Sequence, residues 1–121
     1  MRISLGDLAD RLTICMRKIR LQINSVTEDE IQDILSSIEE IFEALPIERK
    51  KEFFSDLCTL ADLNYQIWHL EFHLRTADET DIEDAIAGQK GKQIRKLNSQ
   101  RNGIRSKMNM YSNTGYRIVN L

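Results

Sequence analysis

The chain has 121 residues, of which 30% are charged and 41% hydrophobic, a composition typical of one ordinary globular domain, residues 1–121. No apolar run approaches the ~20 residues that a membrane-spanning helix needs. An acidic residue, Asp7, comes too early for a secretion signal. We therefore expect a cytoplasmic protein without a membrane span.

The charges are unevenly distributed along the chain. Residues 1–84 carry all 19 acidic residues and 9 basic ones, whereas residues 85–121 carry 8 basic residues and no acidic one. Such asymmetry indicates either an anionic partner or pairing within the fold. Seven acids and no base lie between Glu28 and Glu43. We expect this acidic segment to form ion pairs with the basic residues of 85–121, within one chain or between subunits. We therefore predict internal or subunit-to-subunit pairing rather than nucleic-acid binding.

Two short amphipathic helices are predicted in the first part of the chain. The first begins at Ser4, whose hydroxyl can cap free amides, with Asp7 in the capping-box position. The second is capped by Thr27 and Glu30. The apolar stripe of the first helix is Leu5, Leu8, Leu12, Cys15, Ile19 and Ile23. The predicted buried face of the second helix is Ile31, Ile34, Leu35, Ile38, Ile41, Phe42 and Leu45.

A third, long helix is predicted from Pro46, which stops the second helix, to about Ala77. Two adjacent apolar stripes on this helix predict that it packs against two others. The first stripe is Phe53, Leu57, Leu60, Ile67 and Leu74. The second stripe is Phe54, Cys58, Ala61, Trp68 and Phe72. Both cysteines, Cys15 and Cys58, are interpreted as small core residues rather than as a disulfide or a metal pair.

The fourth helix is predicted after a cap formed by Thr80 and Glu83. Gly88 and Gly91 weaken its first half by roughly 1 kcal/mol each, which leaves a later start, near Gln89, as an alternative. Residues 113–115 are predicted to end the helix, and residues 116–121 are strand-like. Four amphipathic helices with short turns predict an all-α, antiparallel four-helix bundle with two long C-terminal helices.

Several polar residues fall on the predicted buried faces. Helical geometry places Asn64, Glu71 and Arg75 beside Trp68 on the third helix, and it places Arg101 on the inner face of the fourth. Buried polar groups are costly unless they are paired. One interpretation, which we favour, is a hydrogen-bonded core network or a dimer interface.

The alternative interpretation of these residues is a pocket for a polar ligand. Glu71 would act as a base or acceptor, and Arg75 or Arg101 would clamp an anion. If the fourth helix starts late, Asn64, Glu71, Asn98 and Arg101 converge. Other motifs indicate no cofactor or metal: His69 and His73 have metal-pair spacing, but they are predicted to face solvent.

Two segments carry a resemblance to known proteins. Residues 64–71, followed by Arg75, and residues 97–102 contain an Asn, a Trp, a Glu and an Arg on one helix and an Asn-x-x-Arg on the next. This pattern resembles small uncharacterised bacterial all-helical families that are encoded near glycosyltransferase and lipopolysaccharide biosynthesis genes. Residues 4–14 also resemble the start of one such family. The resemblance implies a helical fold and a glycan-related gene context, and it implies no reaction.

The first hypothesis for function is therefore an interaction or assembly module, a homo-oligomer or a binder of a partner protein, that serves bacterial glycan biosynthesis. The alternative is a small-molecule binder or enzyme for a phosphorylated sugar or sugar nucleotide. Its candidate ligand-binding residues are Asn64, Trp68, Glu71, Arg75, Asn98 and Arg101. No catalytic residue is assigned.

Overall fold

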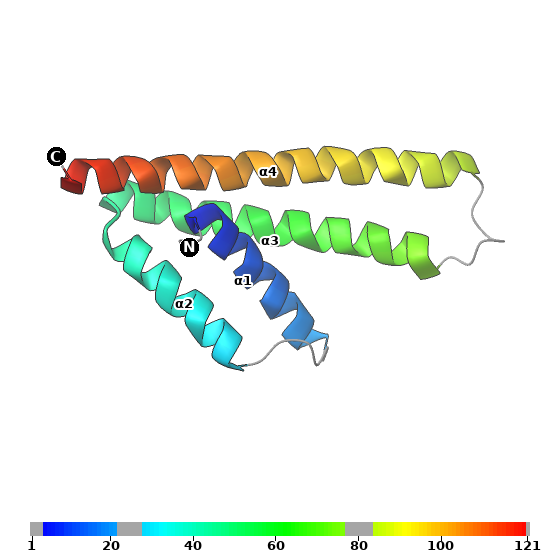
Figure 1. Cartoon of the computed structure of the whole chain (residues 1–121). Coiled ribbons are helices and arrows are strands. Elements are labelled where there is room, and N and C mark those ends of the chain that lie inside the picture. Colours follow the sequence, from blue (N-terminus) through cyan, green and yellow to red (C-terminus); the bar gives the residue numbers. More distant parts are fainter. Residues whose placement is uncertain (1–3, 22–27, 77–83, 121) are drawn as a thin grey trace.

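The computed structural model describes residues 4–21, 28–76 and 84–120, with side chains in the last helix up to Ser112. The described residues form α1 (Leu5–Arg20), α2 (Glu28–Glu43), α3 (Ile47–Thr76) and α4 (Asp84–Asn120). Helices α3 and α4 lie side by side and antiparallel, and the shorter pair α1 and α2 packs across one half of them (Figure 1). The predicted all-α bundle with two long C-terminal helices is confirmed.

The two helix pairs are not equivalent layers. Helix α1 packs against all three other helices, whereas α2 packs mainly against α1. The C-terminal half of α3 and the N-terminal half of α4 extend beyond the short pair as a two-helix arm (Figure 1). None of the described helices combines the length and the apolarity needed to cross a membrane.

The core lies where the short pair meets the long pair. Leu60 of α3 and Met108 of α4 are completely buried there, together with Leu5 at the start of α1. A smaller apolar cluster of Leu63, Ile67 and Leu97 joins α3 to α4 towards the arm. Helix α1 is therefore the element that ties the small pair to the large one.

The start of α1 differs in detail from the predicted capping box. Ser4 has the extended backbone of an N-cap residue, but its hydroxyl makes no cap hydrogen bond to the backbone. Instead it donates to the Asp7 carboxylate at 2.7 Å. Asp7 is thereby oriented away from the helix axis, towards α4. The predicted caps at Thr27, Thr80 and Glu83 lie outside the described residues.

Helix α4 begins at Asp84, close to the predicted cap, and it ends later than predicted. It contains Gly88 and Gly91, so the alternative start near Gln89 is wrong. It also continues through residues 113–115 to Asn120, so the predicted strand-like tail is helical. One glycine costs a helix only about 1 kcal/mol. That cost is small for a 37-residue helix that packs along α3.

Several side chains predicted to be buried are exposed instead. Ile19 is 50% exposed, Leu35 42% and Phe54 58%. Cys58 is exposed as well, whereas Cys15 is buried as predicted. Ile19 is exposed because α1 diverges from α3 towards the C-terminal end of α1 (Figure 1). Phe54 lies near the start of α3, where its contacts with the Phe42 and Phe53 rings leave most of its own ring exposed. Amphipathic spacing predicts a face, but it does not show how far a neighbouring helix follows that face.

Candidate functional site

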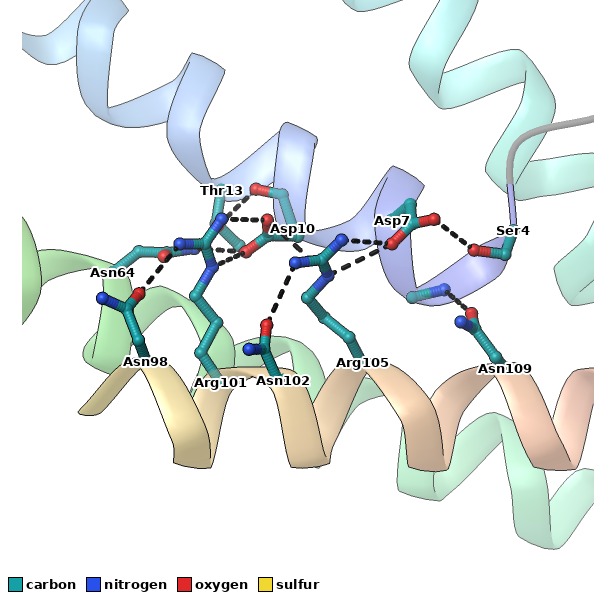
Figure 2. A network of polar contacts seen from close by, with 11 residues as sticks. Ser4, Asp7, Asp10, Thr13, Asn64, Asn98, Arg101, Asn102, Arg105 and Asn109 are labelled. Atoms are coloured by element: carbon teal, nitrogen blue, oxygen red, sulfur yellow. Dashed lines mark hydrogen bonds and ion pairs between the residues drawn. The ribbon is translucent and has the colours of Figure 1, made fainter. Parts of the chain in front are cut away.

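The centre of the candidate site is an ion pair between α1 and α4. Asp10 of α1 is 5% exposed. The guanidinium of Arg101 donates from Nε to Asp10 Oδ1 at 2.9 Å and from Nη2 to Oδ2 at 2.7 Å (Figure 2). This is the bidentate geometry that makes Arg–carboxylate pairs strong and directional. A carboxylate so far from solvent needs such a partner.

Helix α3 contributes the third side of this network. The amide of Asn64 donates to Asp10 Oδ1 and to Thr13 Oγ1, both at 2.8 Å. The Thr13 hydroxyl donates in turn to the Asp10 carbonyl at 2.8 Å. Asn98 Oδ1 accepts from Arg101 Nη1 at 3.3 Å. Both oxygens of the Asp10 carboxylate are thus satisfied, and the network fixes the register of three helices.

A second unit of the same kind lies further along α4. Arg105 donates to Asp7 Oδ1 at 2.5 and 3.1 Å, and it donates to Asn102 at 3.3 Å (Figure 2). One turn further on, Asn109 Oδ1 accepts from the Gly6 amide at 2.7 Å. An Asn-x-x-Arg unit therefore occurs twice in succession on α4, and each arginine binds one aspartate of α1.

These ion pairs shift the ionisation of their members. The hydrogen bond to Asp10 raises the pKa of Arg101 against the opposing effect of burial. The hydrogen bonds from Arg105 and Ser4 lower the pKa of Asp7 below its ordinary value of 3.8. A carboxylate whose pKa is lower in the folded state stabilises the fold above its unfolded pKa. That contribution is lost as the pH falls through the lowered value.

The ion pair of Asp7 should make the stability of the protein depend on pH in the acidic range. We expect Asp7→Asn to reduce the free energy of unfolding at neutral pH by less than about 1 kcal/mol, because the Asp7 side chain is 43% exposed. The difference from the natural protein should shrink below pH 3.8 and vanish in stronger acid. Urea denaturation at a series of pH values measures this. A difference that is constant with pH would show that the ion pair does not stabilise the fold.

A pocket of about 200 Å³ opens beside the network, between α1, α3 and α4. Its polar lining comprises three cationic side chains, one carboxylate and one amide. Ile14, Arg17, Lys18, Asn64, Ile67, Trp68, Glu71 and Arg101 line it. Asn64 and Arg101 belong to both the pocket and the network, so the network forms one wall of the pocket.

Arg17 is the most distinctive side chain of this pocket. Its guanidinium carbon lies 4.4 Å from the centre of the Tyr65 ring and 5.3 Å from that of Trp68. These distances are typical of cation–π contacts, which hold a guanidinium in place without neutralising it. Its Nε is buried and has no hydrogen-bond partner among the described residues. A buried donor without a partner is uncommon in folded proteins.

The structure brings four of the six predicted site residues to this pocket: Asn64, Trp68, Glu71 and Arg101. Asn98 lies beside it through its hydrogen bond to Arg101. Arg75 does not reach the pocket; it is exposed, and its Nε approaches the Glu71 carbonyl at 3.4 Å. Glu71 is also exposed rather than buried, at the rim. Arg75 lies in the last turn of α3, beyond the residues of α3 that line the pocket.

The contribution of α1 was not predicted. Asp10, Arg17 and Lys18 complete the network and the pocket. A signal for them exists, because Gly6, Asp10, Thr13 and Arg17 follow one another at spacings of four, three and four residues. This is a second stripe beside the apolar one, and on α1 it faces α3 and α4.

The basic residues of α4 pair differently from the prediction. Arg101 and Arg105 contact acids of α1, and Lys107 contacts the buried Asp56 of α3 at 3.1 Å. Internal pairing therefore occurs, but its acids come from α1 and α3 rather than from α2. The physical reason is the topology, because α2 packs mainly on the far side of α1.

The described residues contain no group of three or more His, Cys, Asp or Glu side chains that could hold a metal ion. His69 and His73 are both exposed, as predicted, and the His69 ring stacks on Tyr65. The groups of the pocket that could contact a ligand are its three cations, its carboxylate, its amide and its tryptophan.

Comparisons with protein-family models, with curated proteins and with solved structures found no match for this chain.

Proposed function

We propose that this protein binds a small phosphorylated metabolite, a phosphorylated sugar, in the pocket between α1, α3 and α4. The observation that carries the proposal is the convergence of Arg17, Lys18 and Arg101 on one pocket that contains a single acid, Glu71. The bidentate partner of Arg101, Asp10, lies behind it in the network. The pocket side thus has an excess of positive charge, which suits an anion.

The form of the cations favours phosphate. A guanidinium has five N–H donors, and Arg101 uses three of them in the network, which leaves donors for a ligand. The Arg17 guanidinium lies over the rings of Tyr65 and Trp68. Its Nε has no hydrogen-bond partner among the described residues. Planar, fixed guanidinium groups bind phosphate oxygens in defined directions. Lys18 adds a third positive charge.

The remaining lining favours a sugar attached to that phosphate. Trp68 offers an apolar surface, and Asn64 and Glu71 offer polar atoms for hydroxyl groups. Pockets for drug-sized ligands measure roughly 300–1,000 Å³. The volume of about 200 Å³ is smaller. A phosphorylated sugar therefore suits the pocket better than a whole sugar nucleotide.

Isothermal titration calorimetry with glucose 1-phosphate, inorganic phosphate and glucose tests this function. A hydrogen bond to a charged group is worth about 1.5–3 kcal/mol, so Arg17→Met and Lys18→Met should each weaken sugar-phosphate binding at least about tenfold. Arg95→Met, which removes an exposed cation of α4, is the matched control and should leave the affinity unchanged. Equal binding by all three variants, or no heat with any phosphorylated compound at millimolar concentration, would refute the proposal.

The hypothesis of an assembly module in glycan biosynthesis stays a prediction that rests on the sequence resemblance. It is compatible with a sugar-phosphate pocket, since both concern the same class of metabolites. Binding of a ligand does not by itself make the protein an enzyme. Glu71 is the pocket residue that could accept a proton from a bound hydroxyl group.

A further inference from the structure

Helix α3 carries a second apolar stripe, most of which is exposed to solvent. It borders the pocket, because Trp68 lines the pocket and Arg17 of α1 lies over the Tyr65 and Trp68 rings. Its members follow one another at spacings of four, three, four, three and four residues: Phe54, Cys58, Ala61, Tyr65, Trp68 and Phe72. Phe54 is 58% exposed, Tyr65 45% and Phe72 44%. Cys58 and Ala61 are also exposed, and Trp68 is half-buried. Spacings that alternate between four and three residues are the pattern by which one helix packs along another.

The bundle itself is packed through a different stripe of α3, so the exposed stripe is not needed for packing within one chain. Phe53, Leu60 and Ile67 have the same seven-residue period, and they are at most 5% exposed in contact with α1 and α4. A helix that packed only through its buried stripe would carry polar residues on the neighbouring face, where Phe54 follows Phe53 by one residue. Contiguous exposed apolar surface of this kind marks an interaction site.

The order of large and small side chains indicates what covers the stripe. If a second copy of α3 is laid antiparallel on the stripe, the side chains match in size. In the middle of the contact a large residue faces a small one, and at each end two phenylalanines face each other. The facing pairs are Phe54 with Phe72, Cys58 with Trp68, and Ala61 with Tyr65. Alternation of large and small side chains across a contact is what close packing requires. A second copy related by a twofold axis provides this match.

Charges at the two ends of the stripe are complementary in the same arrangement. His73 and Arg75 lie in the last turn of α3, beside Phe72. The opposite end, Phe54, contacts the Phe42 ring of α2 at 5.5 Å between centroids. Glu43 and Glu39, next to Phe42 and one turn before it, are exposed on α2. Each end also carries one opposite charge, since Lys50 lies over the Phe42 ring and Glu71 is exposed beside Phe72. Reversal brings Arg75 of one copy towards Glu39 and Glu43 of the other.

We propose that two copies of this chain form an antiparallel dimer through the exposed stripe of α3. Phe54, Tyr65 and Phe72 are its apolar anchors, and Arg75 of each copy pairs with Glu39 and Glu43 of the other. The arrangement gives the exposed Arg75 a role that the pocket does not. It does not depend on a ligand in the pocket.

Sedimentation equilibrium of the full chain tests the dimer. We expect a dimer at protein concentrations of about 100 μM, well above the micromolar dissociation constants of modest homodimers. Tyr65→Glu and Phe72→Glu should each raise the dissociation constant at least about 100-fold, because each buries two unpaired charges in the symmetric interface. Met110→Glu, at a site of α4 that is 71% exposed, should leave it unchanged. Circular dichroism checks that all variants remain folded.

A charge exchange and a cross-link test the orientation. Arg75→Glu should weaken the dimer, and the same change combined with Glu39→Lys and Glu43→Lys should restore it. In an antiparallel pair Cys58 faces Trp68, so oxidation should not link two natural chains through Cys58. Ala61→Cys with Tyr65→Cys, in a Cys58→Ser background, should cross-link rapidly. A natural protein that is monomeric at 100 μM, a dimer indifferent to Tyr65→Glu and Phe72→Glu, or efficient Cys58–Cys58 linkage would overturn the proposal.

Discussion

Replacing Arg101 by methionine should lower the free energy of unfolding by about 3 kcal/mol, the largest effect expected of any single change in the polar network. The variant leaves the Asp10 carboxylate, 5% exposed, without its bidentate partner. The cost of breaking a buried pair is about 3–5 kcal/mol. We expect the lower end, because Asn64 still donates to Asp10 and Arg105 lies 3.9 Å from it. Urea denaturation followed by circular dichroism measures the change.

Two controls separate the ion pair from the loss of a long side chain. Arg95→Met removes an exposed arginine from the same helix, and it should change stability by no more than about 0.5 kcal/mol. The double variant Asp10→Leu with Arg101→Met removes both charges, so it should lose less than the sum of its two single variants. If Arg101→Met and Arg95→Met were equally stable, the pair would not hold α1 to α4.

Gly6→Ala should destabilise the fold by about 3 kcal/mol, at the upper end of what one added methyl group costs in a tightly packed site. A Cβ atom at Gly6 would collide with the backbone carbonyl of Arg105 and with the Asn109 side chain. Backbone atoms of a packed helix cannot move aside as the end of a flexible side chain can. Helix α1 would have to move away from α4 and lose the bond from the Gly6 amide to Asn109.

The matched control for this change is a second glycine in a helix. Gly103 of α4 is exposed, and nothing lies within 4 Å of an added Cβ. Gly103→Ala should therefore raise stability by about 0.5–1 kcal/mol through helix propensity alone. Thermal and urea denaturation of both variants give the comparison. A Gly6→Ala protein as stable as the natural one would mean that α1 does not approach α4 so closely.

Much of the fold is predictable from local signals. The apolar spacing of Leu5, Leu8 and Leu12 predicts α1, and Pro46 sets the boundary between α2 and α3. The length of α4 is not predictable from its breakers, because Gly88 costs too little to stop a helix that has a long partner. The angle between the two helix pairs is a tertiary property. For this reason the exposure of Ile19 could not be predicted from a pattern along one helix.

The sequence predicts the candidate site more directly on α3 and α4 than on α1. Asn64 and Arg101 attract notice because they interrupt apolar stripes. Asp10 and Arg17 interrupt nothing; they lie beside the apolar stripe, where charged side chains normally face solvent. Their roles arise because α1 crosses α3 and α4 with that flank turned inwards (Figure 2). Arg75 is the opposite case, because it was predicted to belong to the site and does not. It lies on the predicted face of α3, but it is in the last turn of the helix and does not line the pocket.

The central claim is that the arginines of the pocket bind the anionic group of a ligand, and side-chain NMR tests it most directly. In a ¹⁵N-labelled protein titrated with glucose 1-phosphate, the Nε–Hε signals of Arg17 and Arg101 should shift together and saturate. The signals of Arg49 and Arg95, which lie outside the pocket, should stay in place. Unchanged signals of Arg17 and Arg101 at millimolar ligand, or equal shifts of all four arginines, would contradict the claim.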